Sequence, residues 1–265
     1  MNQKAKIEDN AWLAIGGADM YQCLRGGKLP KKSGYRSALI VGALLLLCTG
    51  CSKDSAPEIK RLEPILYLQV PTIECPVDKD QDGISDLEDI VAGGKEEVRK
   101  RPRYRDAYYA GGYPPENEGV CTDVIWRALH HAGYDLKAMI DEDIRQNTSL
   151  YPRVDEGRDA NIDFRRVQNL RVFFQRHGQE LTTEVIANDV DNLSQWQPGD
   201  IVTFALPHEH IAIISDRRRP DGIPFILHNG GPVASEEDRL LSWPSPITGH
   251  YRFPKFDGAL METAG

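Results

Sequence analysis

Two apolar runs joined by a short polar connection constrain the fold of this chain most strongly. In "WQPGDIVTFALPHEHIAIISD", a turn at Pro198-Gly199 precedes a strand-like run from Asp200 to Ala205, and a second run extends from His210 to Ser215. A third run, "IPFILHNGG", follows. Ahead of these runs, apolar residues recur at helical spacing. Helices followed by several strands predict an α+β domain in which helices pack on an antiparallel sheet.

Two core-facing helices are expected before the strands. The apolar stripe of the first is Val124, Ile125, Ala128, Leu129 and Ala132, and that of the second is Phe164, Val167, Leu170 and Phe174. Gly133 and Gly178 are natural stops. Cys121 lies at the N-terminal end of the first helix, where unpaired N–H groups and the helix dipole favour an anion. We therefore expect a thiol of lowered pKa, although an isolated cysteine at a helix start is more often a core residue.

A base and a third polar residue follow Cys121 in the order that nucleophilic catalysis requires. His210 begins the second strand, and His228 and Asn229 end the third. Because neighbouring residues of a strand point to opposite faces, only one of His228 and Asn229 can orient His210. His208 is an alternative base, and "HEH" also admits a zinc site, which we disfavour because no second ligand cluster has matching spacing.

These landmarks resemble a known group of enzymes. "YYAGG", "GVCTD", "WQPGDIVTF", "HIAII" and "FILHN" are similar, in this order, to the NlpC-type papain-like cell-wall cysteine peptidases. With "DLKAMIDEDI", "NIDFRRVQNLRVFF" and "ITGHYRF", residues 82–253 resemble more closely the family called domain of unknown function 1287. The resemblance implies a papain-like fold with the nucleophile at a helix N-terminus. It implies these roles: Cys121 as nucleophile, His210 as base, His228 as third residue, with Asn229 as alternative, and Tyr108 near the reacting centre.

Two features adjoin this constellation. Thr122 and Asp123 stand where the peptidases usually have Ser and Gly, so the oxyanion surroundings are expected to differ. Arg165 and Arg166 precede the second core-facing helix. Such a pair ordinarily forms a solvated face; the alternative is that the two arginines bind the carboxylate of an acidic peptide substrate.

A regular series of acidic residues precedes the first helical pattern. "DKDQDGISDLED" has the spacing of an EF-hand-type calcium loop, and its final Asp resembles dockerin and thrombospondin-type repeats. The expected ligands are Asp78, Asp80, Asp82, the Ile84 carbonyl, Asp86 and Asp89. We expect one structural Ca²⁺ and no organic cofactor, with a merely solvated acidic turn as the alternative. Gly93-Gly94 is expected to break the helix that follows.

The N-terminal residues have the pattern of an export signal. Lysines and Arg36 precede an apolar run from Ala38 to Leu47, and "LCTGC" resembles a lipobox in which Cys51 receives a lipid. The predicted location is the bacterial cell envelope, periplasm-facing and lipid-anchored at the outer membrane or cell surface. Residues 1–51 carry seven Lys/Arg and three Asp/Glu, so the rest of the chain is more acidic than the net charge of −8, which argues against nucleic-acid binding. Export makes a Cys75–Cys121 disulfide the competitor of a free nucleophile.

The predicted organisation has five parts. They are a leader and lipoprotein signal (1–51, of which 1–19 reads as a gene-start artefact), a tether (52–75), a calcium-loop element (76–100), a papain-like catalytic domain (101–256) and a tail (257–265). The expected function is hydrolysis of an amide bond in peptidoglycan peptides through a Cys-His-polar triad. The alternatives are a non-catalytic calcium-braced envelope binding protein and an acyltransferase on the same fold; the sequence does not determine the oligomeric state.

Overall fold

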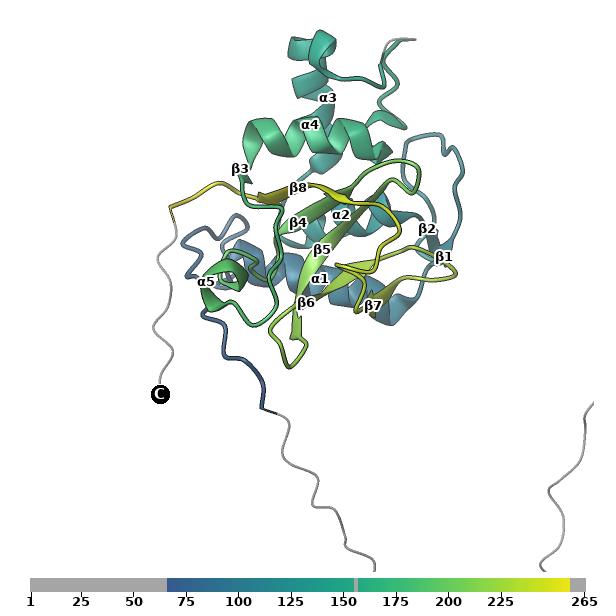
Figure 1. Cartoon of the computed structure of the whole chain (residues 1–265). Coiled ribbons are helices and arrows are strands. Elements are labelled where there is room, and N and C mark those ends of the chain that lie inside the picture. The colour runs from purple at the N-terminus through teal and green to yellow at the C-terminus, as the bar shows by residue number, and fades with distance from the viewer. Residues whose placement is uncertain (1–65, 155–156, 258–265) are drawn as a thin grey trace, which may run out of the picture. The chain divides into compact units, whose positions relative to one another are not determined.

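The computed structural model describes residues 66–154 and 157–257 of the chain (Figure 1). The expected leader with Cys51, most of the tether and nearly all of the tail lie outside the described residues. Among the helices of the described part, none is both long enough and apolar enough to cross a membrane.

Helices precede most of the strands, as the sequence pattern predicts. The helical segments are α1 (Asp86–Lys100), α2 (Cys121–His131), α3 (Leu136–Asn147), the 3-10 turns η1 (Thr148–Leu150) and η2 (Asp163–Arg165), α4 (Val167–His177) and α5 (Val190–Leu193). The strands are β1 (Arg103–Tyr104), β2 (Glu118–Gly119), β3 (Gln179–Glu180), β4 (Ile201–Phe204), β5 (His210–Arg218), β6 (Pro224–His228), β7 (Ser235–Glu237) and β8 (Ile247–Arg252). The α+β class is confirmed.

The main sheet has six strands in the order β3-β8-β4-β5-β6-β7, and each neighbouring pair is antiparallel. Its central strands are buried on both faces. Along β5, Ile211 and Ile213 join one apolar cluster with α1 and α2, whereas Ala212 and Ile214 join a second cluster with the segment around α5. Burial on both faces explains why these strands read as continuous apolar runs.

Helices α1 and α2 pack on each other and on the central strands (Figure 1). The expected break at Gly93-Gly94 is wrong, because α1 continues through both residues. A Cβ atom at Gly93 would lie 2.8 Å from Ala128 Cα and 2.8 Å from His131 Cβ. The absence of a side chain therefore lets α1 approach the backbone of α2, and the helical hydrogen bonds and packing outweigh the low helix propensity of glycine.

Candidate functional site

The Cys121 thiol is buried at the first residue of α2, in the core beside the sheet. Burial raises the pKa of this thiol to about 12, although the backbone N–H groups of Ile211, Thr122 and Cys121 that face the sulfur act in the opposite direction. The nearby carboxylate of Asp123 adds to the increase. The expectation of a lowered thiol pKa is thus wrong for the resting structure, because desolvation outweighs the helix dipole.

His210 begins β5, directly before Ile211, and contacts a second histidine. Nε2 of His210 lies 2.8 Å from Nδ1 of His228, the last residue of β6. Nε2 of His228 lies 3.5 Å from Oε2 of Glu237 on β7. Because the β6–β7 register pairs His228 with Ser235, Glu237 lies two residues further along the same face, within diagonal reach. We call His210, His228 and Glu237 the histidine relay.

An indole ring covers the histidine relay. Trp243 stacks on His210 with 3.9 Å between ring centroids and 16° between planes. Burial lowers the pKa of His210 to about 2, with further contributions from His228 and Arg239. Burial also lowers the pKa of His228, while the carboxylate of Glu237 acts in the opposite direction. The buried imidazoles are therefore held neutral near pH 7.

Asn229 points away from the histidine relay, as alternation along a strand requires. Its Nδ2 donates hydrogen bonds to the carbonyl oxygens of Pro102 and Gly119, each at 3.1 Å. Gly119 lies two residues before Cys121, so Asn229 anchors the segment that leads into α2. Of the two candidates for the third residue, the one that contacts His210 is His228.

Asp123 and Arg165 form a buried ion pair beside Cys121. Arg165 Nε and Nη2 donate to the two carboxylate oxygens of Asp123, both at 2.8 Å, and Nη1 donates to the Ala107 carbonyl at 2.9 Å. Asp123 also accepts from the Val120 N–H at 2.7 Å and from the Trp126 indole at 2.9 Å. Arg165 therefore lies neither on a solvated face nor free to bind a substrate; the carboxylate that it holds is that of Asp123.

The other expected contributors to a substrate site have partners elsewhere. Arg166 donates to the Arg153 carbonyl and lies 3.3 Å from the Asp163 carboxylate. The exposed Tyr108 donates its hydroxyl to Asp159 at 3.0 Å. The structure thus does not bring Arg166 or Tyr108 into contact with the histidine relay.

A different tyrosine, Tyr104, lies opposite Gly119, two residues before Cys121. Tyr104 on β1 has a raised pKa, first because it is partly buried and second because the charge that Cys121 would carry is near its hydroxyl. Gly231 packs on the same residue, since a Cβ there would lie 3.5 Å from Tyr104 Cβ. The sequence did not single out Tyr104, because only the pairing of β1 with β2 brings it beside the start of α2.

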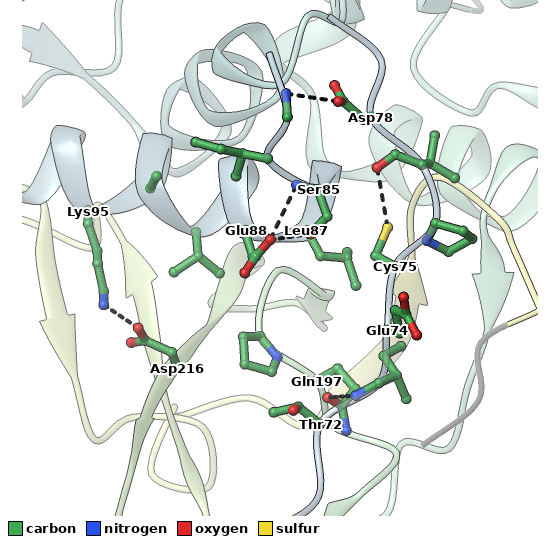
Figure 2. A pocket seen from close by; sticks show the side chains of 18 residues that line it. Thr72, Glu74, Cys75, Asp78, Ser85, Leu87, Glu88, Lys95, Gln197 and Asp216 are labelled. Carbon is green, nitrogen blue, oxygen red and sulfur yellow. Dashed lines mark hydrogen bonds and ion pairs between the residues drawn. The ribbon is translucent and has the colours of Figure 1, made fainter. Parts of the chain in front are cut away.

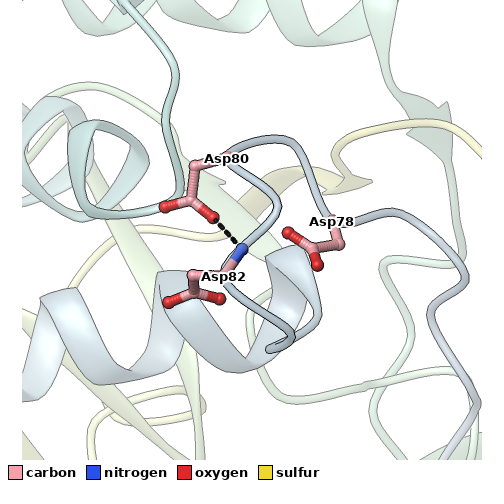
Figure 3. Close-up of side chains that lie close together, drawn as sticks. All are labelled: Asp78, Asp80 and Asp82. Atoms are coloured by element: carbon pink, nitrogen blue, oxygen red, sulfur yellow. Dashed lines mark hydrogen bonds between the residues drawn. The ribbon is translucent and has the colours of Figure 1, made fainter.

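The acidic loop, residues 78–89, draws three carboxylates together immediately before α1 (Figure 3). One oxygen from each of Asp78, Asp80 and Asp82 lies within 4.8 Å of the others. Gly83 has a φ of 92°, as the turn at position six requires. Ile84, at position seven, is exposed.

Two further acidic residues of the loop are buried and differ in their partners. Asp86 accepts from the Lys79 N–H at 2.7 Å and from the Tyr134 hydroxyl, so both of its oxygens are engaged. Asp89 is 1 % exposed, and neither of its carboxylate oxygens has a hydrogen-bond partner among the described residues. Burial raises the pKa of Asp89, as do the charges of Asp82 and Asp80. Of the two carboxylates, that of Asp86 is engaged within the protein, and that of Asp89 has no such partner among the described residues.

A cavity of about 680 Å³ lies between α1 and the segment from Thr72 to Asp78 (Figure 2). Gln197 binds that segment, accepting from the Ile73 N–H at 3.0 Å. Cys75 lines the cavity, and neither Cys121 nor His210 does. Within residues 66–154 and 157–257, Cys75 and Cys121 are free thiols, so the alternative disulfide between them is not formed.

Comparison with known proteins identifies related sequences. The family described as "Domain of unknown function (DUF1287)" matches residues 91–253, which include Cys121 and the histidine relay and begin after the acidic loop. The chain is also similar to a protein of Escherichia coli (strain K12) named "Uncharacterized protein YijF". The two are 38% identical over 172 residues, which cover 62% of this chain and 80% of the relative.

Proposed function

We infer that this chain, which belongs to the family described as Domain of unknown function (DUF1287), uses Cys121 to cleave an amide bond in a peptide. The observation that carries the proposal is the arrangement at the start of β5. The sulfur of Cys121 faces the Ile211 N–H, and the preceding residue, His210, is linked to His228. A thiol, a base and a group that orients the base are the components of nucleophilic catalysis by cysteine.

The histidine relay favours one arrangement of protons. The carboxylate of Glu237 can only accept, so it favours a proton on Nε2 of His228 and leaves Nδ1 of His228 as an acceptor. Nε2 of His210 then carries the proton of the 2.8 Å bond, and Nδ1 of His210 keeps its lone pair. We assign Nδ1 of His210 as the base for the Cys121 thiol.

The proposed reaction has two stages. Nδ1 of His210 takes the thiol proton while the sulfur of Cys121 bonds to the substrate carbonyl carbon, and the N–H groups at the start of α2 stabilise the oxyanion. The C–N bond then breaks, and His210 returns the proton to the departing amine. Water, deprotonated by His210, attacks the thioester, which releases the carboxylic acid and restores the thiol.

Burial determines the resting protonation state in this mechanism. The shifts described above oppose both thiolate and imidazolium, so the resting pair is a neutral thiol and a neutral imidazole. Proton transfer accordingly accompanies attack on the bound substrate, instead of preceding it.

The proposed substrate is a peptide of the bacterial cell wall. Support comes from the ordered landmarks that resemble NlpC-type peptidases and from the leader that resembles a lipoprotein signal. A lipid on Cys51 would hold the enzyme at the membrane, beside that polymer. Transfer of the acyl group to an amine requires the same first stage, and the products distinguish it from hydrolysis.

The decisive experiment is product analysis on peptidoglycan fragments. We expect the full chain to release a new amine and a new carboxyl group, and we expect Cys121→Ala and His210→Ala to reduce the rate at least 100-fold. His208→Ala is the matched control: His208 is exposed, lies two residues before His210, and should retain activity.

Three outcomes would overturn parts of this proposal. Unchanged digestion by Cys121→Ala would exclude the nucleophile. Peptidoglycan binding without turnover, with no loss on either substitution, would favour the non-catalytic binding protein. A product in which the acyl group is joined to an added amine would favour acyl transfer over hydrolysis.

A further inference from the structure

We propose that the acidic loop binds one calcium ion, and that this ion fixes the C-terminal end of the helix that carries Cys121. The proposal does not depend on the function of Cys121. Its first basis is the convergence of Asp78, Asp80 and Asp82. Its second is the buried carboxylate of Asp89, which has no hydrogen-bond partner among the residues that the structure describes.

Asp89 is the observation that distinguishes this loop from an ordinary acidic turn. A buried carboxylate normally accepts several hydrogen bonds, because removing it from water is otherwise strongly unfavourable. Both oxygens of Asp89 lack such a partner among the described residues. A cation shared by Asp89 and the carboxylates of the loop would compensate the removal of Asp89 from water and the repulsion among the negative charges.

The positive charges that face the loop are few. Nδ1 of His131 lies 3.7 Å from Asp89 Oδ1, and no lysine or arginine of the described part of the chain forms an ion pair with Asp89. In the same part of the chain, no lysine or arginine forms an ion pair with Asp78, Asp80 or Asp82. Within the described residues, these three carboxylates are therefore not neutralised by a lysine or arginine.

The number of oxygen donors in the loop favours calcium over magnesium. One oxygen from each of Asp78, Asp80 and Asp82 lies within 4.8 Å of the others, close enough for all three to bind one ion. Mg²⁺ is usually held by one or two carboxylates and several waters, whereas Ca²⁺ accepts a larger and less regular set of oxygens. With Asp89 and the Ile84 carbonyl, the loop supplies five oxygen-bearing groups, and water completes the six to eight ligands that calcium takes.

The loop contacts the end of α2 at three places. Asp86 accepts the Tyr134 hydroxyl, His131 lies beside Asp89, and the backbone at Gly133 packs against the loop. Gly133 has a φ of 77°, and a Cβ there would lie 2.9 Å from Asp80 Cβ. The C-terminal end of a helix carries partial negative charge. Carboxylates beside the end of α2 are therefore repelled by it, whereas a cation bound among them is attracted.

Calorimetric titration and thermal unfolding of the full chain test the proposal. After treatment with chelator, the protein should bind one Ca²⁺ per chain, and Ca²⁺ at 100 times its Kd should raise Tm by about 5–10 °C. Asp89→Asn should abolish both effects. Without calcium, its Tm should equal or exceed that of the wild type, because the amide places no charge beside Asp80 and Asp82.

Asp141→Asn is the matched control, since it removes one exposed carboxylate far from the loop in sequence and should bind Ca²⁺ as the wild type does. Asp82→Asn, an exposed position within the loop, should fold and lose binding. Folded wild-type protein that gives no heat with millimolar Ca²⁺ would overturn the proposal, as would undiminished binding by Asp89→Asn. A Mg²⁺ response as large as the Ca²⁺ response would overturn the assignment of the ion.

Discussion

Replacement of Arg165 by methionine should destabilise the domain strongly. Methionine preserves much of the aliphatic stem but leaves the carboxylate of Asp123 without its cation. Both side chains of this pair are 1 % exposed, and two N–H···O contacts of 2.8 Å join them. Removing one partner of such a buried pair costs about 3–5 kcal/mol, because the remaining charge stays buried and unpaired.

The assay is urea unfolding followed by tryptophan fluorescence, with calorimetry for Tm. For a domain of this size, the expected loss corresponds to a decrease in Tm of about 6–20 °C. Arg158→Met is the matched control, because Arg158 pairs with Asp141 at a similar distance, 2.7 Å, but the side chains are 34% and 41% exposed. An exposed pair contributes about 0–1 kcal/mol, so this control should remain near the wild type.

A double-mutant cycle tests the pairing itself. Asp123→Asn keeps an oxygen that can accept from Val120 and removes the charge. We expect the double variant with Arg165→Met to be less destabilised than the sum of the two single variants, by about 1–3 kcal/mol. A loss for Arg165→Met no greater than that for Arg158→Met, or strict additivity in the cycle, would refute the reasoning.

Three further predictions concern the candidate site. Alkylation of Cys121 by iodoacetamide, measured by peptide mass spectrometry, should keep accelerating above pH 9, since burial raises the pKa of Cys121 to about 12; a plateau below pH 8 would contradict this. The free energy of unfolding should fall by about 2 kcal/mol from pH 7 to pH 5 through His210, because the unfolded imidazole gains a proton near pH 6.5 and the folded one has a pKa of about 2. His210→Gln should flatten that slope in a urea series, and an unchanged slope would be evidence against it. Asn229→Ala should reduce stability by about 1–3 kcal/mol in urea unfolding, because two buried hydrogen bonds are lost while both carbonyls keep another donor; a loss below about 0.5 kcal/mol would disagree.

The spacing of apolar residues and glycines in the sequence predicted the helices and strands. The prediction failed where contact with another helix, and not the local sequence, determines the structure. The ends of α2 and α4 fall just before Gly133 and Gly178, and β4 and β5 lie where the apolar runs predict them. Gly93 is the exception, because its low helix propensity predicted a break that α1 does not have. The close approach of Gly93 to Ala128 results from the packing of α1 on α2, which the local sequence does not reveal.

The candidate site also combines features that the sequence predicted with features that depend on how the strands pair. The order of Cys121, His210 and His228, the alternation that separates His228 from Asn229, and the spacing of the acidic loop are properties of the sequence itself, because backbone geometry repeats with fixed periods. Glu237 carries no such signal, since only the β6–β7 register brings it to His228.

Only the tertiary structure decided the electrostatics. Arg165 is 42 residues from Asp123 in the chain. The sequence therefore predicted a surface position for Arg165, and only the folded structure shows that the two residues are buried together. The raised pKa of Cys121 and the lowered pKa of His210 likewise arise from burial. Water is excluded from these groups only when the core assembles, so the local sequence cannot predict the pKa shifts that burial causes.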